Sequence, residues 1–204
     1  MKGTEKVLVV KRNLIFEKGS WQGIRRENLN YYLDLIRRNS QFKLREEIET
    51  DLSFKQIVPY IIFSFQEKYF IFQHLKKAAE QRLKGDWLLG ISGHINPIDI
   101  EQNKNVIEIA AHREWGEEIN YKGKIIGRKL IGILNDEKRN VEAAHLAIVY
   151  HFKGNSSKIS IKERGVLKGK LIELKNLAKF VENTGGYAPI VYRDYLKINK
   201  NNFS

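Results

Sequence analysis

Three glutamates that would share one helical face constrain this chain more than any other feature. Glu114, Glu117 and Glu118 stand at positions i, i+3 and i+4, so a helix would project their carboxylates from one side. Like charges at this spacing repel each other and destabilise a helix. A bound divalent cation would remove that repulsion, and carboxylate oxygens suit hard ions such as magnesium or manganese. The alternative is an ordinary charged helix end, paired locally with Arg113.

A strand and a glycine loop precede the acidic segment. Trp87–Ile91 has the composition of a strand, and it leads into Gly93-His94-Ile95-Asn96-Pro97. Further on, Asn105 followed by Glu108 forms a near-capping box, which predicts that the helix begins after Asn105. We interpret Glu108 as part of this cap, and a role as a site carboxylate is the alternative.

Residues 113–118, Arg-Glu-Trp-Gly-Glu-Glu, resemble the R-E-U-x-E-E core of the Nudix box, where U is a bulky apolar residue. This box is the signature of MutT-type pyrophosphohydrolases, and its full pattern is G-x5-E-x7-R-E-U-x-E-E-x-G-U. Counting back without a gap places Asn105 at the first Glu of the pattern and Asp99 at its first Gly. Its closing Gly falls on Asn120, a residue type that can adopt a left-handed conformation.

A longer loop restores the beginning of the pattern. Residues 93–96, Gly-His-Ile-Asn, resemble the glycine–histidine opening of many Nudix boxes, with about six extra residues before the helix. A subgroup of predicted MutT-like phosphoesterases has a similar stretch and a similarly long loop. We therefore place the family glycine at Gly93.

The resemblance implies an α/β fold, the Nudix-like α/β/α sandwich with a mixed β-sheet and a loop-helix-loop active site. It also implies an enzyme, a pyrophosphohydrolase that cleaves a nucleoside diphosphate linked to another moiety by attack of water on phosphorus. The expected cofactor is Mg2+ or Mn2+. Its implied ligands are Glu114, Glu117, Glu118 and the carbonyl of Gly93, with His94 beside them as a binding residue. Arg113 would orient the carboxylates.

The general base and two rival functions stay open. Glu142 and Glu163 are the nearest candidates for the base by position. The first rival is a catalytically silent Nudix-like nucleotide-binding module, because Asn105 replaces the first Glu and the loop is long. The second is a nucleic-acid-binding protein, because the net charge is +12 and a basic stretch runs through Lys153, Lys158, Lys162, Arg164, Lys168 and Lys170.

Composition bounds the remaining possibilities. A chain of 204 residues suits one domain, 1–204, in which residues 1–55 are an N-terminal elaboration and 197–204 a disordered tail. The absence of cysteine excludes disulfides and thiolate chemistry. No stretch approaches the ~18 apolar residues of a membrane span, and the N-terminus lacks a signal-peptide pattern, so we expect a cytoplasmic protein. Nucleic-acid binding should be weak and non-specific, and the oligomeric state stays open, a homodimer included.

Local patterns predict the other elements. Asn28 can cap a helix whose apolar residues are Leu29, Tyr32, Leu33 and Ile36. Gln56–Phe65 and Tyr69–His74 read as a hairpin. Phe42–Thr50 reads as a solvated helical turn or connector, and Lys76–Lys84 as a basic surface segment. Extended segments are expected at Val7–Val10, Leu14–Phe16, Lys124–Leu134, His145–Phe152, Ile159–Ile161 and Leu171–Leu174, and helices at Leu177–Glu182 and Pro189–Leu196. His145 or His151 could face a phosphate, although a structural role is preferred for each.

Overall fold

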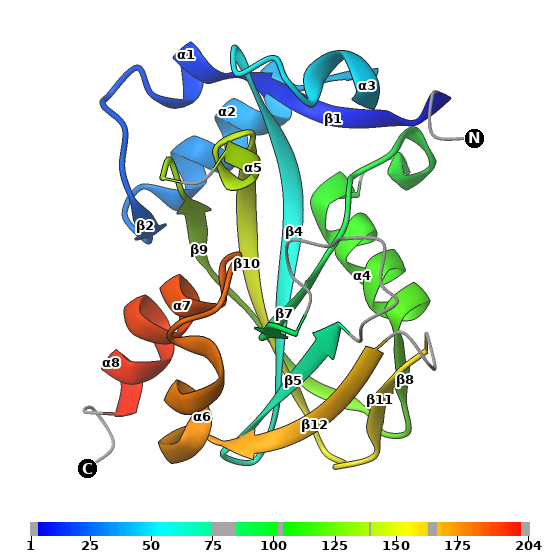
Figure 1. Ribbon diagram of the computed structural model, residues 1–204. Helices are drawn as coiled ribbons and strands as arrows, with labels where there is room; N and C mark the ends of the chain where they lie inside the picture. Colours follow the sequence, from blue (N-terminus) through cyan, green and yellow to red (C-terminus); the bar gives the residue numbers. More distant parts are fainter. Residues whose placement is uncertain (1–3, 75–84, 102–103, 139, 163–166, 201–204) are drawn as a thin grey trace. The chain divides into compact units, whose positions relative to one another are not determined.

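A computed structural model describes residues 4–74, 85–101, 104–138, 140–162 and 167–200 (Figure 1). The chain forms two compact units. The first contains Met1–Tyr60, Ser92–Arg113 and Ile131–Val149, and the second contains Ile61–Ile91, Glu114–Leu130 and Tyr150–Ser204. Strands β4 (Phe54–Phe65), β9 (Ile125–Asn135) and β10 (His145–Gly154) contribute residues to both. The hydrogen-bonded strand order is β12-β5-β4-β10-β9-β2, and the prediction of a mixed α/β fold is confirmed.

Strand β1 (Lys6–Lys11) organises the first unit because four consecutive valine and leucine side chains bury both of its faces. It pairs antiparallel with β3 (Gln41–Leu44) and with β4, where Val9 lies opposite Gln56. Strand β2 (Gly23–Arg25) pairs with β9, with Ile24 opposite Leu134. The predicted strand at Val7–Val10 is therefore confirmed and slightly longer.

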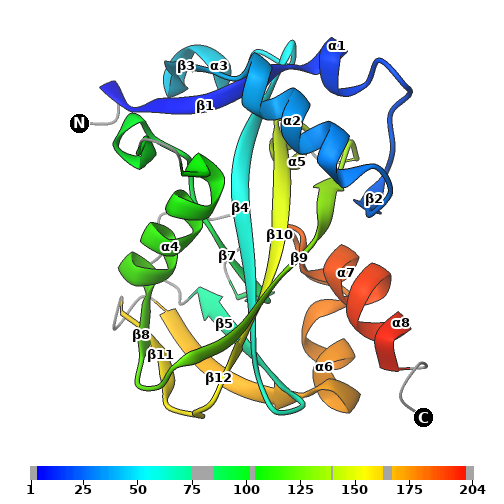
Figure 2. The same cartoon turned by 180° about the vertical axis from the view of Figure 1, so that it is seen from behind.

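The predicted amphipathic helix of the first unit is α2 (Leu29–Asn39), which packs against β1 (Figure 2). Its buried residues are Tyr32 and Ile36, as the 3.6-residue period requires. Asn28 stands at the N-cap position as predicted, but it has a φ of 55° and its side chain makes no capping hydrogen bond. The remaining helical segments of this unit are short: α1 (Arg12–Ile15), α3 (Arg45–Ile48), η3 (Pro97–Asp99) and α5 (Asn140–Ala143).

One local prediction in the first unit is wrong, and a second is confirmed only in part. Leu14–Phe16 was expected to be extended, but α1 covers Arg12–Ile15, because the buried Ile15 and the bond from Arg12 N to Ser53 O favour a turn there. In the segment Phe42–Thr50, helix α3 confirms the predicted helical turn, but the residues before it belong to strand β3, since β1 pairs with them and places Leu8 opposite Phe42. Tertiary pairing overrides local preference in both cases.

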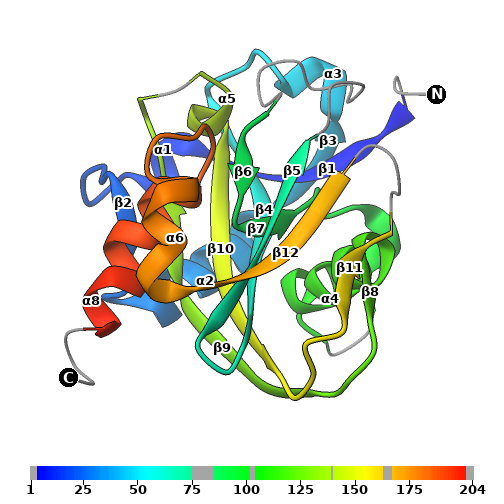
Figure 3. The ribbon, with the colours of Figure 1, turned by 60° about the horizontal axis from the view of Figure 1, so that its bottom comes forward.

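The second unit is built on a hairpin of β4 and β5 (Lys68–His74). Ser64 lies opposite Tyr69 and Phe65 opposite Lys68, so the predicted hairpin is confirmed, and a turn of two residues joins its strands. Gln66 takes the left-handed φ of 54° that such tight turns require. Strand β12 (Leu167–Glu173), longer than predicted, pairs along the whole of β5 (Figure 3). Shorter strands complete the unit: β6 (Trp87–Leu88), β7 (Gly90–Ser92), β8 (Ile119–Tyr121) and β11 (Ile159–Ile161).

The C-terminal helices follow β12 and confirm the two helices predicted there. They are α6 (Leu174–Val181), α7 (Ala188–Val191), the π-helical turn η4 (Tyr192–Leu196) and α8 (Lys197–Lys200). Proline stands in the first turn of α7, where its missing N–H costs no hydrogen bond. Helix α8 corrects the prediction of a disordered tail for its four residues, whereas 201–204 lie outside the described residues, as does the predicted basic segment Lys76–Lys84. Among the described helices, none is both long and apolar enough to cross a membrane.

His151 links the hairpin to the C-terminal helices. It is 3% exposed, its Nε2 lies 2.8 Å from Ser64 Oγ, and its Nδ1 lies 2.9 Å from Tyr195 OH. The structural role preferred for this histidine agrees with these contacts. Burial lowers the pKa of His151 to about 4, helped by Lys153 and Lys129, so the imidazole is neutral at neutral pH.

This burial should make stability depend on pH. Between pH 6.5 and 4 the unfolded chain binds a proton at this histidine that the folded chain does not, so stability falls as pH falls through that window. We expect His151 to account for about 2 kcal/mol of the loss between pH 7.5 and 5.0. Urea unfolding of wild type and His151→Gln at both pH values measures it. The variant should lose less stability than wild type on acidification, and equal losses would contradict the prediction.

Candidate functional site

Helix α4 (Val106–Glu118) carries the acidic triplet and places a carboxylate on its buried side. Ile107, Ala110 and Ala111 are buried, and Glu114 continues this i, i+3, i+4, i+7 stripe at 8% exposure. Glu117 is exposed and Glu118 is half-buried. One member of the triplet therefore stands on the face that the apolar residues of the helix bury.

The start of α4 lies where the sequence predicted it. The Oδ1 of Asn105 accepts a hydrogen bond from Ile107 N at 3.0 Å, which satisfies one of the free amides of the first turn. The carbonyl of Asn105 accepts the first helical bond, from Ile109 N at 3.0 Å. Glu108 is exposed, and its part in the cap stays a prediction.

Arg113 reaches back from α4 to the loop that precedes the helix. Its Nε donates to Asp99 Oδ1 at 2.7 Å, and its Nη2 donates to Asp99 Oδ2 at 2.9 Å. The same Nη2 donates to the carbonyl of His94 at 2.8 Å. This two-pronged pairing with a carboxylate that is 1% exposed fixes the loop against the first half of the helix.

The loop between β7 and α4 is also closed on itself. Asn96 N donates to Asp99 Oδ2 at 2.8 Å, and Asp99 N donates to the carbonyl of Asn96 at 2.9 Å. The side-chain amide of Asn96 donates to Lys6 O at 2.8 Å, which ties the loop to β1. Gly93 and His94 open this loop directly after β7, and Gly93 is half-buried.

His94 is a neutral imidazole in this loop. Burial lowers its pKa to about 4, with further lowering by Arg45 and His145, although Glu5 acts in the opposite direction. The 3.6 Å approach of its Nδ1 to Glu5 Oε1 is therefore a dipolar contact rather than an ion pair. Within the described part of the chain, its buried Nε2 has no hydrogen-bond partner. A neutral ring with an uncommitted nitrogen can donate or accept, according to its tautomer.

The second half of α4 is held separately, within the second unit. Trp115 packs against Phe63 and Phe152, with ring centroids 5.4 and 5.6 Å away, and Tyr121 completes the aromatic cluster at 6.1 Å. These contacts orient the part of the helix that carries the three carboxylates.

The end of α4 passes directly into strand β8. Ile119 pairs with Ile161 of β11, and Lys162 N donates to Glu118 O at 2.8 Å. The ammonium of Lys162 donates to the carbonyl of Gly116, a favourable place for a cation near a helix C-terminus. Asn120, at the closing position of the box, lies in β8 and is not left-handed, because strand pairing continues through it.

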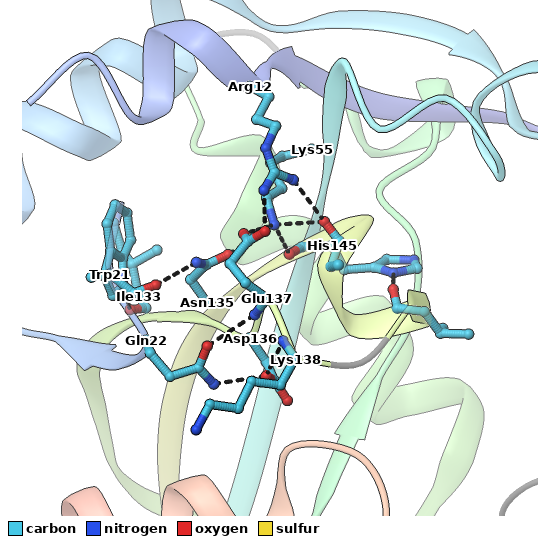
Figure 4. A network of polar contacts seen from close by, with 12 residues as sticks. Arg12, Trp21, Gln22, Lys55, Ile133, Asn135, Asp136, Glu137, Lys138 and His145 are labelled. Atoms are coloured by element: carbon cyan, nitrogen blue, oxygen red, sulfur yellow. Dashed lines mark hydrogen bonds and ion pairs between the residues drawn. The ribbon is translucent and has the colours of Figure 1, made fainter. Parts of the chain in front are cut away.

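A polar network in the first unit holds the connection from β9 to β10 (Figure 4). Lys55 is fully buried, and its Nζ donates to Glu137 Oε1 at 2.7 Å, Asn135 Oδ1 at 2.8 Å and Ala143 O at 2.6 Å. Arg12 pairs with the same Glu137 and donates to Ala143 O at 3.3 Å. Both ends of the connection are thus fixed by residues from the N-terminal part of the chain.

One of the two candidate bases, Glu142, falls in this connection. Glu142 lies on α5 at 5% exposure, and its charge raises the otherwise lowered pKa of His145. His145 Nδ1 donates to Val141 O at 2.7 Å, and its ring centroid lies 5.6 Å from that of His94. Glu163 lies outside the described residues. The role of either glutamate as base stays a prediction.

Comparison with known proteins identifies chains of similar sequence and similar fold. No protein-family model matches the sequence. The chain is 26% identical over 183 residues to Protein YmaB of Bacillus subtilis, covering 85% of this chain and 87% of YmaB. Tm1382, a solved structure whose own assignment as a Nudix hydrolase is provisional, matches with a TM-score of 0.80 at 25% identity, over 95% of this chain and 99% of Tm1382. The Nudix domain of NrtR from Shewanella oneidensis, solved with ADP-ribose, matches with a TM-score of 0.53 at 12% identity, over 74% and 89%.

The chain has a Nudix fold of the MutT type. The resemblance predicted from residues 113–118 is therefore confirmed at the level of the fold.

Helix α4 carries the segment that resembles the Nudix box and is called the Nudix helix from here on. Its donor chemistry fits a hard divalent cation. Glu114, Glu117 and Glu118 offer carboxylate oxygens on neighbouring turns, the donor type that Mg2+ and Mn2+ prefer. As the side chains lie among the described residues, however, no group of three or more His, Asp or Glu is gathered closely enough to hold an ion. Rotation of these side chains would therefore have to accompany binding, as expected when three like charges repel each other.

Asp99 is the site-supporting residue that sequence reasoning missed. The ungapped count placed the family glycine there, so its charge was not considered. A buried acid 14 residues before an arginine of the Nudix helix leaves no periodic signal, and its pairing with Arg113 emerges from the folded loop.

Asp99→Asn tests this pairing. We expect a loss of roughly 2 kcal/mol, less than the about 3–5 kcal/mol for breaking a fully buried pair, because the Arg113 side chain is 21% exposed. Urea unfolding measures the change. The matched control is Asp34→Asn, whose partner Arg37 is exposed on α2, and it should cost less than about 0.5 kcal/mol. Similar losses for both variants would show that Asp99 does not fix the loop.

Asn105→Ala tests the start of the Nudix helix. The change removes the side-chain oxygen that accepts from Ile107 N, so we expect a loss of about 1 kcal/mol. Thermal or urea unfolding checks it, with Asn105→Ser as the rescue because serine retains a capping oxygen. If serine destabilises the protein as much as alanine, capping is not the function of this side chain.

Proposed function

We propose that this chain is a metal-dependent Nudix-type pyrophosphohydrolase. It would hydrolyse a nucleoside diphosphate linked to another moiety by attack of water on phosphorus. The observation that carries the proposal is Glu114, a carboxylate at 8% exposure on the buried stripe of the helix that holds two further glutamates. Burial of a charge beside like charges costs folding free energy, and a bound cation would neutralise these charges.

The carboxylates of Glu114, Glu117 and Glu118 would hold Mg2+ or Mn2+, with the carbonyl of Gly93 as a further oxygen ligand. When bound, such an ion neutralises charge on phosphate oxygens and lowers the pKa of a water molecule. Arg113 would act without touching substrate, because its donors are directed at the loop carrying His94 and Asp99. Whether it also orients the carboxylates, as the resemblance implies, is part of the proposal.

The chain's own residues would keep the two halves of the box rigid. In the first unit, Asp99 and Asn96 hold the loop that presents Gly93 and His94. In the second unit, Trp115 and Lys162 hold the acidic end of the helix. Rigid placement of ligands before substrate binds reduces the ordering cost of binding.

Substrate identity is a separate question. NrtR was solved with ADP-ribose bound to its Nudix domain, so ADP-ribose belongs at the head of a substrate panel. Dinucleoside polyphosphates and nucleotide sugars complete the panel, assayed by release of a monophosphate with magnesium and then manganese. We propose Glu142 and Glu163 as the candidates for the base.

A catalytically silent Nudix-like module is the second candidate, favoured by one observation. Asn105, which stands at the first glutamate of the ungapped pattern, is engaged as a helix cap and has no carboxylate to offer. Such a module would bind nucleotide derivatives without turnover. Release of monophosphate from any member of the panel excludes it.

A nucleic-acid-binding role receives less support from the basic stretch. Lys162 bonds a helix carbonyl, and Lys170 lies between Trp87 and Phe180, with its Nζ 4.2 and 4.0 Å from their ring centroids. These cations are engaged within the fold. Arg164 lies outside the described residues. We propose weak, salt-sensitive binding of nucleic acid without sequence selectivity.

We also propose that the enzyme is cytoplasmic and acts as a monomer or a homodimer.

Glu118→Gln and Glu117→Gln test the metal-site proposal. Each removes one carboxylate, so we expect turnover to fall on the order of 100-fold, comparable with losing one transition-state-stabilising donor. The melting temperature of the metal-free protein should hold or rise, because repulsion within the triplet decreases. Initial rates with saturating Mg2+ measure the first effect.

The matched control is Glu108→Gln. It makes the same chemical change at an exposed position in the first turn of the same helix. Its turnover should stay near that of wild type. Near-wild-type rates in both Glu117→Gln and Glu118→Gln would overturn the assignment of the metal ligands.

A further inference from the structure

A cleft of about 560 Å³ opens in the first unit, at the end of β1 and the beginning of β4. Lys11 lies opposite Phe54 in the β1–β4 ladder, and Arg12 N donates to Ser53 O at 2.8 Å, so the two walls are joined by main-chain bonds. The cleft uses no residue of the Nudix box. Its lining is Lys11, Arg12, Asn13, Phe16, Ser53 and Phe54.

Two aromatic rings line this cleft, and cations lie over both. The guanidinium of Arg12 lies 5.2 Å from the centroid of Phe16, and Lys55 Nζ lies 5.4 Å from it. Lys43 Nζ lies 4.6 Å from the centroid of Phe54. Both rings are half-buried rather than enclosed in the core. Because Trp21 also packs edge-on against Phe16, with ring centroids 5.3 Å apart, Phe54 is the ring on which a planar ligand can stack, among positively charged side chains.

The charge of the lining favours an anion. The lining carries two cations and no carboxylate. Lys11 is exposed at the end of β1, and the Arg12 side chain remains 31% exposed although it pairs with Glu137. Glu137 is shared with the buried Lys55, so one carboxylate serves two cations there. Asn13 and Ser53 add polar side chains that can bond sugar or phosphate oxygens.

We propose that this cleft binds a nucleotide, with its base stacked on Phe54 and its phosphate facing Lys11. The volume lies within the roughly 300–1,000 Å³ of small-ligand sites. Stacking on aromatic rings beside a basic groove is also how proteins hold single-stranded nucleic acid. A free mononucleotide and the 5′-terminal nucleotide of a single strand present the same chemistry. The site is independent of the proposed hydrolysis and of its metal.

Calorimetric titration with AMP in EDTA tests the proposal without relying on turnover. We expect binding in EDTA, with a dissociation constant on the order of 0.1 mM. Adenosine and ribose 5-phosphate, which carry only the base or only the phosphate, should each bind at least ~10-fold more weakly, because both halves of the site are needed. A 5′-phosphorylated deoxyadenosine hexamer shows whether a strand end binds more tightly than the free nucleotide.

Substitutions at Lys11 locate the binding. Lys11→Gln should weaken AMP binding by about 5-fold, through loss of one partly screened charge. Lys6→Gln is the matched control, because Lys6 lies exposed on the same strand and makes the same charge change outside the cleft. Its effect should stay within about 2-fold.

Substitutions at Phe54 test stacking. Phe54 packs against a core of Val7, Val9 and Ile48, so truncation to alanine could destabilise the unit. Phe54→Leu retains an apolar side chain and removes the ring face, and we expect about 5-fold weaker binding. Phe54→Tyr should restore it.

Three outcomes would overturn the proposal. One is the absence of AMP binding in EDTA, which leaves a solvent-filled cleft. Another is equal weakening by Lys11→Gln and Lys6→Gln, which indicates diffuse attraction to a basic protein. The third is full binding by folded Phe54→Leu, which excludes stacking at this ring. None of these results depends on whether the box hydrolyses a pyrophosphate, so failure of one proposal is distinguishable from failure of the other.

Discussion

The ion pair between Arg113 and Asp99 is the interaction on which the loop before the Nudix helix depends. A loop about six residues longer than the usual pattern has more conformations to lose when it folds. A planar guanidinium that bonds both carboxylate oxygens and the carbonyl of His94 removes much of that freedom at one point. Because Asp99 is almost fully buried, the pair also keeps the loop from opening into water, since opening would expose one charge and strand the other.

The acidic end of the same helix brings charges of the same sign close together. Glu114 occupies the buried stripe that Ile107, Ala110 and Ala111 begin, where a carboxylate loses most of its contact with water. The surrounding structure compensates with the ring of Trp115 packed on Phe152 and with strand pairing that starts immediately after the helix. Departures of this kind from the most stable sequence are expected where binding or catalysis requires a specific group.

The sequence predicted the elements whose signals are local. The stripe of α2, the hairpin of β4 and β5, and the start of α4 after Asn105 all follow from side-chain period, turn chemistry or capping within a few residues. Predictions failed where distant segments decide. Gln41–Leu44 became a strand because β1 pairs with it, and Asp99 and Lys55 found partners 14 and 80 to 90 residues away. The acidic triplet could be recognised from the sequence, because helical spacing brings its three like charges onto one face. The contacts that hold this helix in place could not be recognised in the same way.

The net charge of +12 is a poor guide to the binding surface, because some of the cations that contribute to it already bond other groups of the fold. Lys55 is buried among carbonyl and carboxylate oxygens, and Lys162 bonds the carbonyl of Gly116 near the helix end. A positive charge that completes a hydrogen-bond network cannot also release counterions from a polyphosphate. What remains available has to be judged residue by residue, from exposure and from partners. By that criterion Lys11, exposed on β1 beside a cleft lined by two rings, offers a more specific site for an anion than the basic stretch that dominates the sequence.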